Sequence, residues 1–80
     1  MHTVQVNLNS VEKVRAFVNS VNTFNSEFDL VSGRFVIDAK SIMGIFSIDL
    51  SRKLTLKIKS DNIDECKKIK EKLKEFIVEE

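Results

Sequence analysis

The sequence predicts an α+β fold, an open-faced sandwich in which helices cover one face of a four-stranded antiparallel sheet, with the element order βαββαβα. Two observations predict the elements. Four short runs alternate apolar and polar residues, and two longer stretches repeat apolar residues every three or four positions. The third observation concerns organisation: no linker, repeat or low-complexity segment interrupts the 80 residues, so residues 1–80 are predicted to form one domain.

The chain begins with a predicted strand and helix. Val4, Val6 and Leu8 alternate with polar residues, which is typical of a strand with one buried face. Asn9 stands three residues before Glu12, which is the spacing of a capping box and predicts a helix start. The helix is expected over about residues 10–22. Its apolar stripe consists of Val11, Val14, Phe17, Val18 and Val21.

A hairpin and a short helix follow. Phe28 and Leu30 belong to one alternating run, Phe35 and Ile37 belong to the next, and Gly33 lies between the two runs. Glycine supplies the positive φ that tight hairpin turns need, so the segment predicts a β-hairpin. Residues 40–46 are too short for a long helix and apolar on too many sides for a surface strand. They predict a helix of one or two turns, with Ser41 as its N-cap.

The last two elements are a strand and a helix. Leu54, Leu56 and Ile58 alternate with residues that are mostly lysine, so the strand has a basic outer face. Either Asp61 or Asn62 can cap the helix that follows. Its apolar stripe consists of Ile63, Cys66, Ile69, Leu73, Phe76 and Ile77. Cys66 lies on this stripe and is expected to be a buried small hydrophobic residue.

The composition excludes several chemistries. The 13 basic and 12 acidic residues give a net charge of +1 with the signs interspersed, so no strong field attracts nucleic acid or membrane. A single Cys cannot form an internal disulfide, and one Cys with one His is too few for a four-ligand zinc site unless carboxylates or a second chain contribute, so no metal or cofactor is expected. No apolar stretch approaches the roughly 18 residues that span a bilayer, and no secretion signal is recognisable. We therefore expect a cytoplasmic protein that binds neither nucleic acid nor membrane.

A basic series on the last strand is a weaker candidate site. Arg52, Lys53, Lys57 and Lys59 could bind RNA. The chain has no Tyr or Trp and lacks the basic and aromatic strand pattern of an RNA-recognition domain. A solvated strand face is the better interpretation.

The most specific stretch runs from Ala39 to Ile48 and reads AKSIMGIFSI. With the element order and the length, it resembles HPr, the histidine-containing phosphocarrier protein of the bacterial sugar phosphotransferase system. The family block K-S-I-M-G-[VI]-[ML]-[ST]-L matches closely from Lys40 to Ser47. The resemblance implies the HPr fold for most of the chain.

The phosphocarrier histidine of that family is missing. In the family it stands at the start of the first helix, within a G-[IL]-H-A-R-P-A motif, accepts phosphate from enzyme I and passes it to sugar-specific transporters. Ser10 stands at the histidine position here, Glu12 at the arginine position and Lys13 at the proline position. A phosphoryl group on imidazole is labile and can be passed on, whereas a serine ester is stable. We therefore expect no phosphocarrier activity.

The single histidine, His2, does not obviously replace the missing one. It is expected to precede the first strand, on a frayed terminus with no helix dipole aimed at it. We therefore interpret His2 as an ordinary surface residue.

Ser41 matches the serine that HPr kinase/phosphorylase phosphorylates in Gram-positive relatives. The resemblance implies a regulatory phosphorylation site there, with Lys40, Ile42, Met43 and Phe46 as a partner-binding surface. The alternative is that Ser41 is only an N-cap and that its apolar neighbours are only core. Glu12, in place of the family arginine, weakens the expectation of binding to the catabolite-control transcription factor.

Three functions remain open from the sequence. The first is a regulatory or adaptor protein, not an enzyme, that binds proteins of the sugar phosphotransferase and catabolite-control systems, HPr kinase/phosphorylase among them. The second is a residual phosphocarrier with an unexpected acceptor such as His2. The third is a protein-protein interaction scaffold without phosphate chemistry. Nothing in the sequence demands more than a monomer.

Overall fold

The computed structural model describes residues 2–78, so Met1, Glu79 and Glu80 of the predicted 1–80 domain lie outside the described residues. The helices and strands follow one another in the predicted order. They are β1 (His2–Val6), α1 (Val11–Val21), β2 (Glu27–Ser32), β3 (Phe35–Asp38), α2 (Ile42–Phe46), β4 (Leu54–Lys59) and α3 (Ile63–Lys72).

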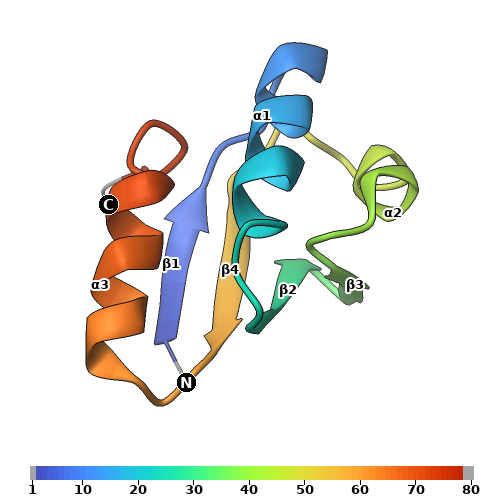
Figure 1. The fold of residues 1–80 in the computed structure, drawn as a ribbon. Helices are drawn as coiled ribbons and strands as arrows, with labels where there is room; N and C mark the ends of the chain where they lie inside the picture. The colour runs from blue at the N-terminus through green and yellow to red at the C-terminus, as the bar shows by residue number, and fades with distance from the viewer. Residues whose placement is uncertain (1, 79–80) are drawn as a thin grey trace.

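The four strands form one antiparallel sheet in the order β1-β4-β2-β3. β4 lies inside the sheet, where its Leu56 pairs with Val4 of β1 on one side and with Leu30 of β2 on the other. The helices cover one face of the sheet and the other face is open (Figure 1). The predicted α+β open-faced sandwich is therefore confirmed.

The core lies between the sheet and the helices. Phe17 of α1 meets Phe76 edge to face, with ring centroids 5.6 Å apart and planes at 89°, an arrangement that aromatic pairs prefer. Cys66 is buried as predicted. No polar or charged residue among residues 2–78 is buried, and every helix and strand except β3 contributes a buried side chain.

The helix starts match the predictions except at α1. Its N-cap is Ser10, not Asn9, and the Ser10 hydroxyl oxygen accepts a hydrogen bond from the Lys13 N–H at 3.1 Å. The predicted box from Asn9 to Glu12 is wrong by one residue, because Ser10 still has an extended backbone and the helical turn begins after it. At α3 the cap is Asn62, whose side-chain oxygen accepts from the Glu65 N–H at 3.0 Å.

Two residues of the predicted apolar stripes are exposed. Val11 is 51% exposed and Ile63 is 64% exposed. Each is the first residue of its helix. Because helical side chains lean toward the N-terminus, a side chain at the first position projects past the end of the packed surface.

The β2–β3 hairpin turns at Gly33, as predicted. Gly33 has φ +58°, and Arg34 completes a two-residue loop that has glycine first, as in a type II′ turn. The expected buried face of β3 is only partly formed. Ile37 is half-buried, but Phe35 is 67% exposed, because β3 is the last strand of the sheet.

α3 ends at Lys72, earlier than the apolar stripe predicted. The chain then turns, and residues 76–78 run along the outer edge of β1. The Asn7 N–H donates to the Phe76 carbonyl at 2.9 Å, and the Val78 N–H donates to the Gln5 carbonyl at 2.9 Å. This segment therefore covers one edge of the sheet.

Candidate functional site

Ser41 begins α2, and its hydroxyl serves as the N-cap that the sequence predicted. The backbone of Ser41 is extended, its side-chain oxygen accepts a hydrogen bond from the Gly44 N–H at 3.2 Å, and its own N–H donates to the Asp38 carbonyl at 3.0 Å. Ser41 is only half-buried. Its hydroxyl is therefore oriented by the helix start, in a residue that is partly open to solvent.

Gly44 leaves the room that the Ser41 hydroxyl occupies. A Cβ at position 44 would lie 3.2 Å from the Ser41 Oγ and 3.7 Å from the Ile37 Cβ. The first distance is tighter than ordinary contact, so a side chain at position 44 would displace the hydroxyl. The glycine of the K-S-I-M-G block thus has a direct steric role next to the serine.

The α2 patch, which we define as Met43 and Phe46, is the exposed apolar part of this helix. Met43 is 78% exposed and Phe46 is 43% exposed. Ile42 is partly buried against the core, and Ile45 is fully buried and anchors the helix. Of the apolar residues predicted to bind partners, Met43 and Phe46 are therefore open to a partner, and Ile42 is only partly so.

Lys40 is engaged within the protein. Its Nζ donates to the Phe24 carbonyl at 2.8 Å and lies 5.7 Å from the centroid of the Phe28 ring. Its backbone N–H donates to the Asp38 Oδ1 at 2.9 Å. The side chain predicted to meet a partner thus joins the α1–β2 connection to the segment that leads into α2.

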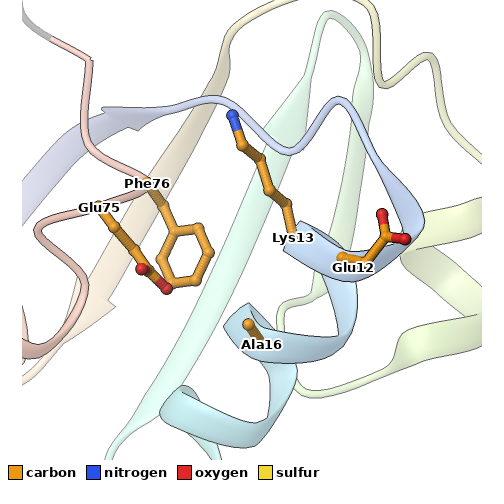
Figure 2. A pocket seen from close by; sticks show the side chains of 5 residues that line it. All are labelled: Glu12, Lys13, Ala16, Glu75 and Phe76. Atoms are coloured by element: carbon orange, nitrogen blue, oxygen red, sulfur yellow. The ribbon is translucent and has the colours of Figure 1, made fainter.

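The start of α1, where the family histidine would stand, carries a different set of groups. Ser10 is used as the helix cap, and beside it lies a pocket of about 230 Å³. Figure 2 shows Glu12 and Lys13 on the first turn of α1 and Phe76 opposite this helix, with the side chain of Glu12 directed away from Phe76. The lining residues include two acidic residues and one basic residue, so the pocket does not favour a phosphate.

His2 lies within β1, which corrects the expectation that it precedes the first strand. It pairs with Ile58 of β4 and is half-buried. It stands at the opposite end of β1 from the connection to α1 (Figure 1). Because a strand rises about 3.3 Å per residue, His2 lies more than about 13 Å from the end of β1 that leads to Ser10.

The basic outer face of β4 is partly neutralised. The Lys59 Nζ lies 2.9 Å from the Asp29 Oδ2, and this hydrogen bond raises the pKa of Lys59 above its usual value. Arg52 lies 3.7 Å from the Asp49 carboxylate. Two of the four cations in the predicted basic series thus have acidic neighbours, which agrees with a solvated strand face.

The geometry of residues 2–78 offers neither a metal site nor a membrane-spanning helix. No group of three or more His, Cys, Asp or Glu side chains in that range could hold a metal ion. None of the helices described there is long and apolar enough to cross a membrane.

The chain is similar to proteins of known family and structure over most of its length. A family model described as "PTS HPr component phosphorylation site" matches residues 6–79. Among solved structures, the chain is similar to HPr-C-His from Thermoanaerobacter tengcongensis, with a TM-score of 0.74 and 26% identity over 94% of this chain and 92% of that one. No curated protein matches the chain.

Two further solved structures share the fold at lower identity. The phosphocarrier protein HPr from Bacillus anthracis has a TM-score of 0.64 and 24% identity, over 89% of this chain and 92% of that one. The catabolite repression containing protein Crh from Bacillus subtilis has a TM-score of 0.61 and 24% identity, over 95% of this chain and 90% of that one.

Proposed function

Because this chain belongs to the HPr family of phosphocarrier proteins of the sugar phosphotransferase system, we propose that it is a regulatory or adaptor member that lacks phosphocarrier activity and acts through Ser41 and α2. The observation that carries the proposal is the use of Ser10 as the cap of α1. Its partners are proteins of the phosphotransferase and catabolite-control systems, including HPr kinase/phosphorylase. It works in the cytoplasm, needs no cofactor and is not itself an enzyme.

Loss of the phosphocarrier reaction follows from the chemistry at the start of α1. A carrier must accept a phosphoryl group and release it again, which suits a neutral imidazole near pH 7 and does not suit an alcohol. The Ser10 hydroxyl is engaged with the Lys13 N–H, and the carboxylate of Glu12 adds negative charge nearby. His2 is too far from this end of the molecule to take over.

Phosphorylation of Ser41 needs only an accessible hydroxyl and a kinase. The Ser41 Oγ would attack the γ-phosphorus of ATP, its proton would pass to a base of the kinase, and ADP would leave. The half-buried hydroxyl, its orientation by the Gly44 N–H and the space left by Gly44 support this role. The phosphate would then stand where backbone N–H groups favour negative charge.

The α2 patch offers the docking surface for the partner. Exposed Met and Phe side chains lose water when a partner covers them, and they are typical contributors to interfaces. Met43 and Phe46 lie on the same five-residue helix that Ser41 caps. A phosphate on Ser41 would therefore change the charge directly beside the contact surface.

The test is incubation with HPr kinase/phosphorylase, ATP and Mg²⁺, followed by intact-mass measurement. We expect one added phosphate on the wild type and on the control variant Ser47→Ala. The Ser47 hydroxyl lies at the other end of α2, where it donates to the Gly44 carbonyl. We expect none on Ser41→Ala, and slower incorporation on Met43→Ser. Absence of phosphate under conditions that modify an ordinary HPr would refute the role of Ser41.

A second reaction tests the loss of phosphocarrier activity. With enzyme I and phosphoenolpyruvate we expect no acid-labile phosphate on the protein. An acid-labile phosphate that disappears in His2→Ala would contradict the proposal and favour the residual phosphocarrier. If Ser41 stays unmodified in cells and only partners unrelated to sugar transport bind, the protein-protein interaction scaffold would replace the proposed regulatory function.

A further inference from the structure

The two edges of the sheet differ in how they are protected. Residues 76–78 cover the outer edge of β1. β3 ends the sheet on the side away from α3, and no other strand described in residues 2–78 pairs with its outer edge (Figure 1). Phe35 is 67% exposed and Val36 is 59% exposed on this strand. An exposed edge with apolar side chains is a template for pairing with another strand.

The register of the hairpin shows which backbone groups of β3 are available. Ser32 pairs with Phe35 across the two-residue loop, and the Ala39 N–H donates to the Phe28 carbonyl at 3.0 Å. Backbone groups alternate in direction along an antiparallel strand. Those of residues 35, 37 and 39 therefore point toward β2. Both groups of Val36 and the N–H of Asp38 are available at the outer edge, whereas the Asp38 carbonyl already accepts from the Ser41 N–H at 3.0 Å.

We propose that the β3 edge binds a second copy of this chain, with the two β3 strands antiparallel and Val36 on the two-fold axis. The two Val36 residues would then exchange both of their outward hydrogen bonds, N–H to carbonyl in each direction. The two sheets would join into one of eight strands. Such a symmetric contact uses the same surface on both copies, as closed dimers do.

The side chains of β3 are complementary in this register. On the open face, Arg34 would lie opposite Asp38 of the second copy, and Val36 would lie opposite its counterpart. On the helix face, Phe35 would lie opposite Ile37. Arg34 and Asp38 are both exposed in the single chain. The Asp38 Oδ1 accepts from the Lys40 N–H at 2.9 Å, so the carboxylate would pair with Arg34 through its other oxygen. Opposite charges and apolar pairs directly across strands are stabilising.

A second copy fits this edge because the register about Val36 places opposite charges across from each other and apolar side chains across from each other. If the register shifts by one residue, Phe35 lies opposite Asp38 and the facing backbone groups point the wrong way. The edge is only four residues long. We therefore expect weak association, with a dissociation constant on the order of 10⁻⁴ M. This inference replaces the monomer expected from the sequence and does not depend on the proposed function.

Sedimentation velocity from about 10 µM to about 1 mM tests the proposal on the full chain. We expect the wild type to shift from monomer to dimer over this range. Val36→Lys, which places two ammonium groups together on the axis, should stay monomeric. Lys67→Glu on exposed α3 is the control for a change of charge and should behave as the wild type.

Charge reversal tests the register itself. Arg34→Glu and Asp38→Lys should each weaken self-association at least about tenfold. An equimolar mixture of the two should associate again, because both cross-strand pairs become attractive. If Asp38→Lys does not fold, Arg34→Glu and Val36→Lys still show whether the β3 edge mediates self-association. A wild type that stays monomeric at about 1 mM, or a dimer that neither variant weakens, would overturn the proposal.

Discussion

Replacing Lys40 by Met should destabilise the fold by about 2 kcal/mol. The Lys40 Nζ contacts the Phe24 carbonyl at 2.8 Å and lies 5.7 Å from the Phe28 ring centroid. A hydrogen bond from a charged group contributes about 1.5–3 kcal/mol, and an ammonium over a ring at an exposed site adds about 0.5–1 kcal/mol. Lys40 is only half-buried, so the lower end of each range applies. Met keeps the length and most of the apolar stem, so it removes chiefly the charge and the donor.

Urea and thermal unfolding measure this change. For a domain of this size, about 2 kcal/mol corresponds to a fall in Tm of roughly 8–16 °C. A double-mutant cycle with Phe28→Leu should return a coupling energy of about 0.5–1 kcal/mol, which isolates the contact between the ammonium and the ring. Lys53→Met, at an exposed position, is the matched control and should stay within about 0.5 kcal/mol of the wild type.

A Lys40→Met variant as stable as the wild type would refute this reasoning. The ammonium would then not hold the Phe24 carbonyl in solution, and Lys40 would be free for a partner. Met43→Ser gives the opposite expectation, because Met43 is 78% exposed. It should leave stability within about 0.5 kcal/mol while weakening partner binding. The two variants therefore distinguish a residue that stabilises the fold around the site from a residue that contacts the partner.

Three other changes have defined outcomes. Gly44→Ala should leave the free energy of unfolding in urea nearly unchanged, because a gain of about 1 kcal/mol in helix propensity offsets the displacement of the Ser41 hydroxyl. In the Ser41→Ala background no hydroxyl is displaced, so the same change should stabilise the fold by about 1 kcal/mol. Phe76→Ala should cost about 3–5 kcal/mol by the same measurement, because the ring is buried. The Ser26 hydroxyl donates to Glu65 and lowers the pKa of that carboxyl below its usual value, so its stabilisation is present above the usual glutamate pKa and is lost as the pH falls through the lowered one. Glu65→Gln should therefore flatten the fall of Tm in this acid range, and an unchanged slope would contradict it.

The elements were predictable because each depends on local pattern. Period-two alternation located β4, and a serine before a short apolar run located the start of α2. The exposure of Phe35 was not predictable from the same kind of pattern. It depends on β3 being the last strand, and strand order is set by contacts between distant segments.

The candidate site divides in the same way. The likeness to the HPr block singled out Ser41, Met43 and Phe46, and in the structure Met43 and Phe46 are exposed and Ser41 is half-buried. It could not reveal that Lys40 reaches back to the Phe24 carbonyl, because that contact joins segments 16 residues apart. Nor could it place His2 inside β1, since the partner strand of that residue comes more than fifty residues later in the chain.

The pairing of β1 with β4 has a consequence for the order of folding. Gln5 and Thr55, whose side chains are hydrogen-bonded at 3.0 Å, are 50 residues apart in the sequence. The β2–β3 hairpin can close through its two-residue loop as soon as it is synthesised, but β1 has no strand to join until β4 has left the ribosome. Closing so long a loop carries an entropic cost that slows folding. We therefore expect β1, although it is synthesised before the other three strands of the sheet, to be among the last of them to be incorporated, and the sheet to be completed only after β4 has emerged.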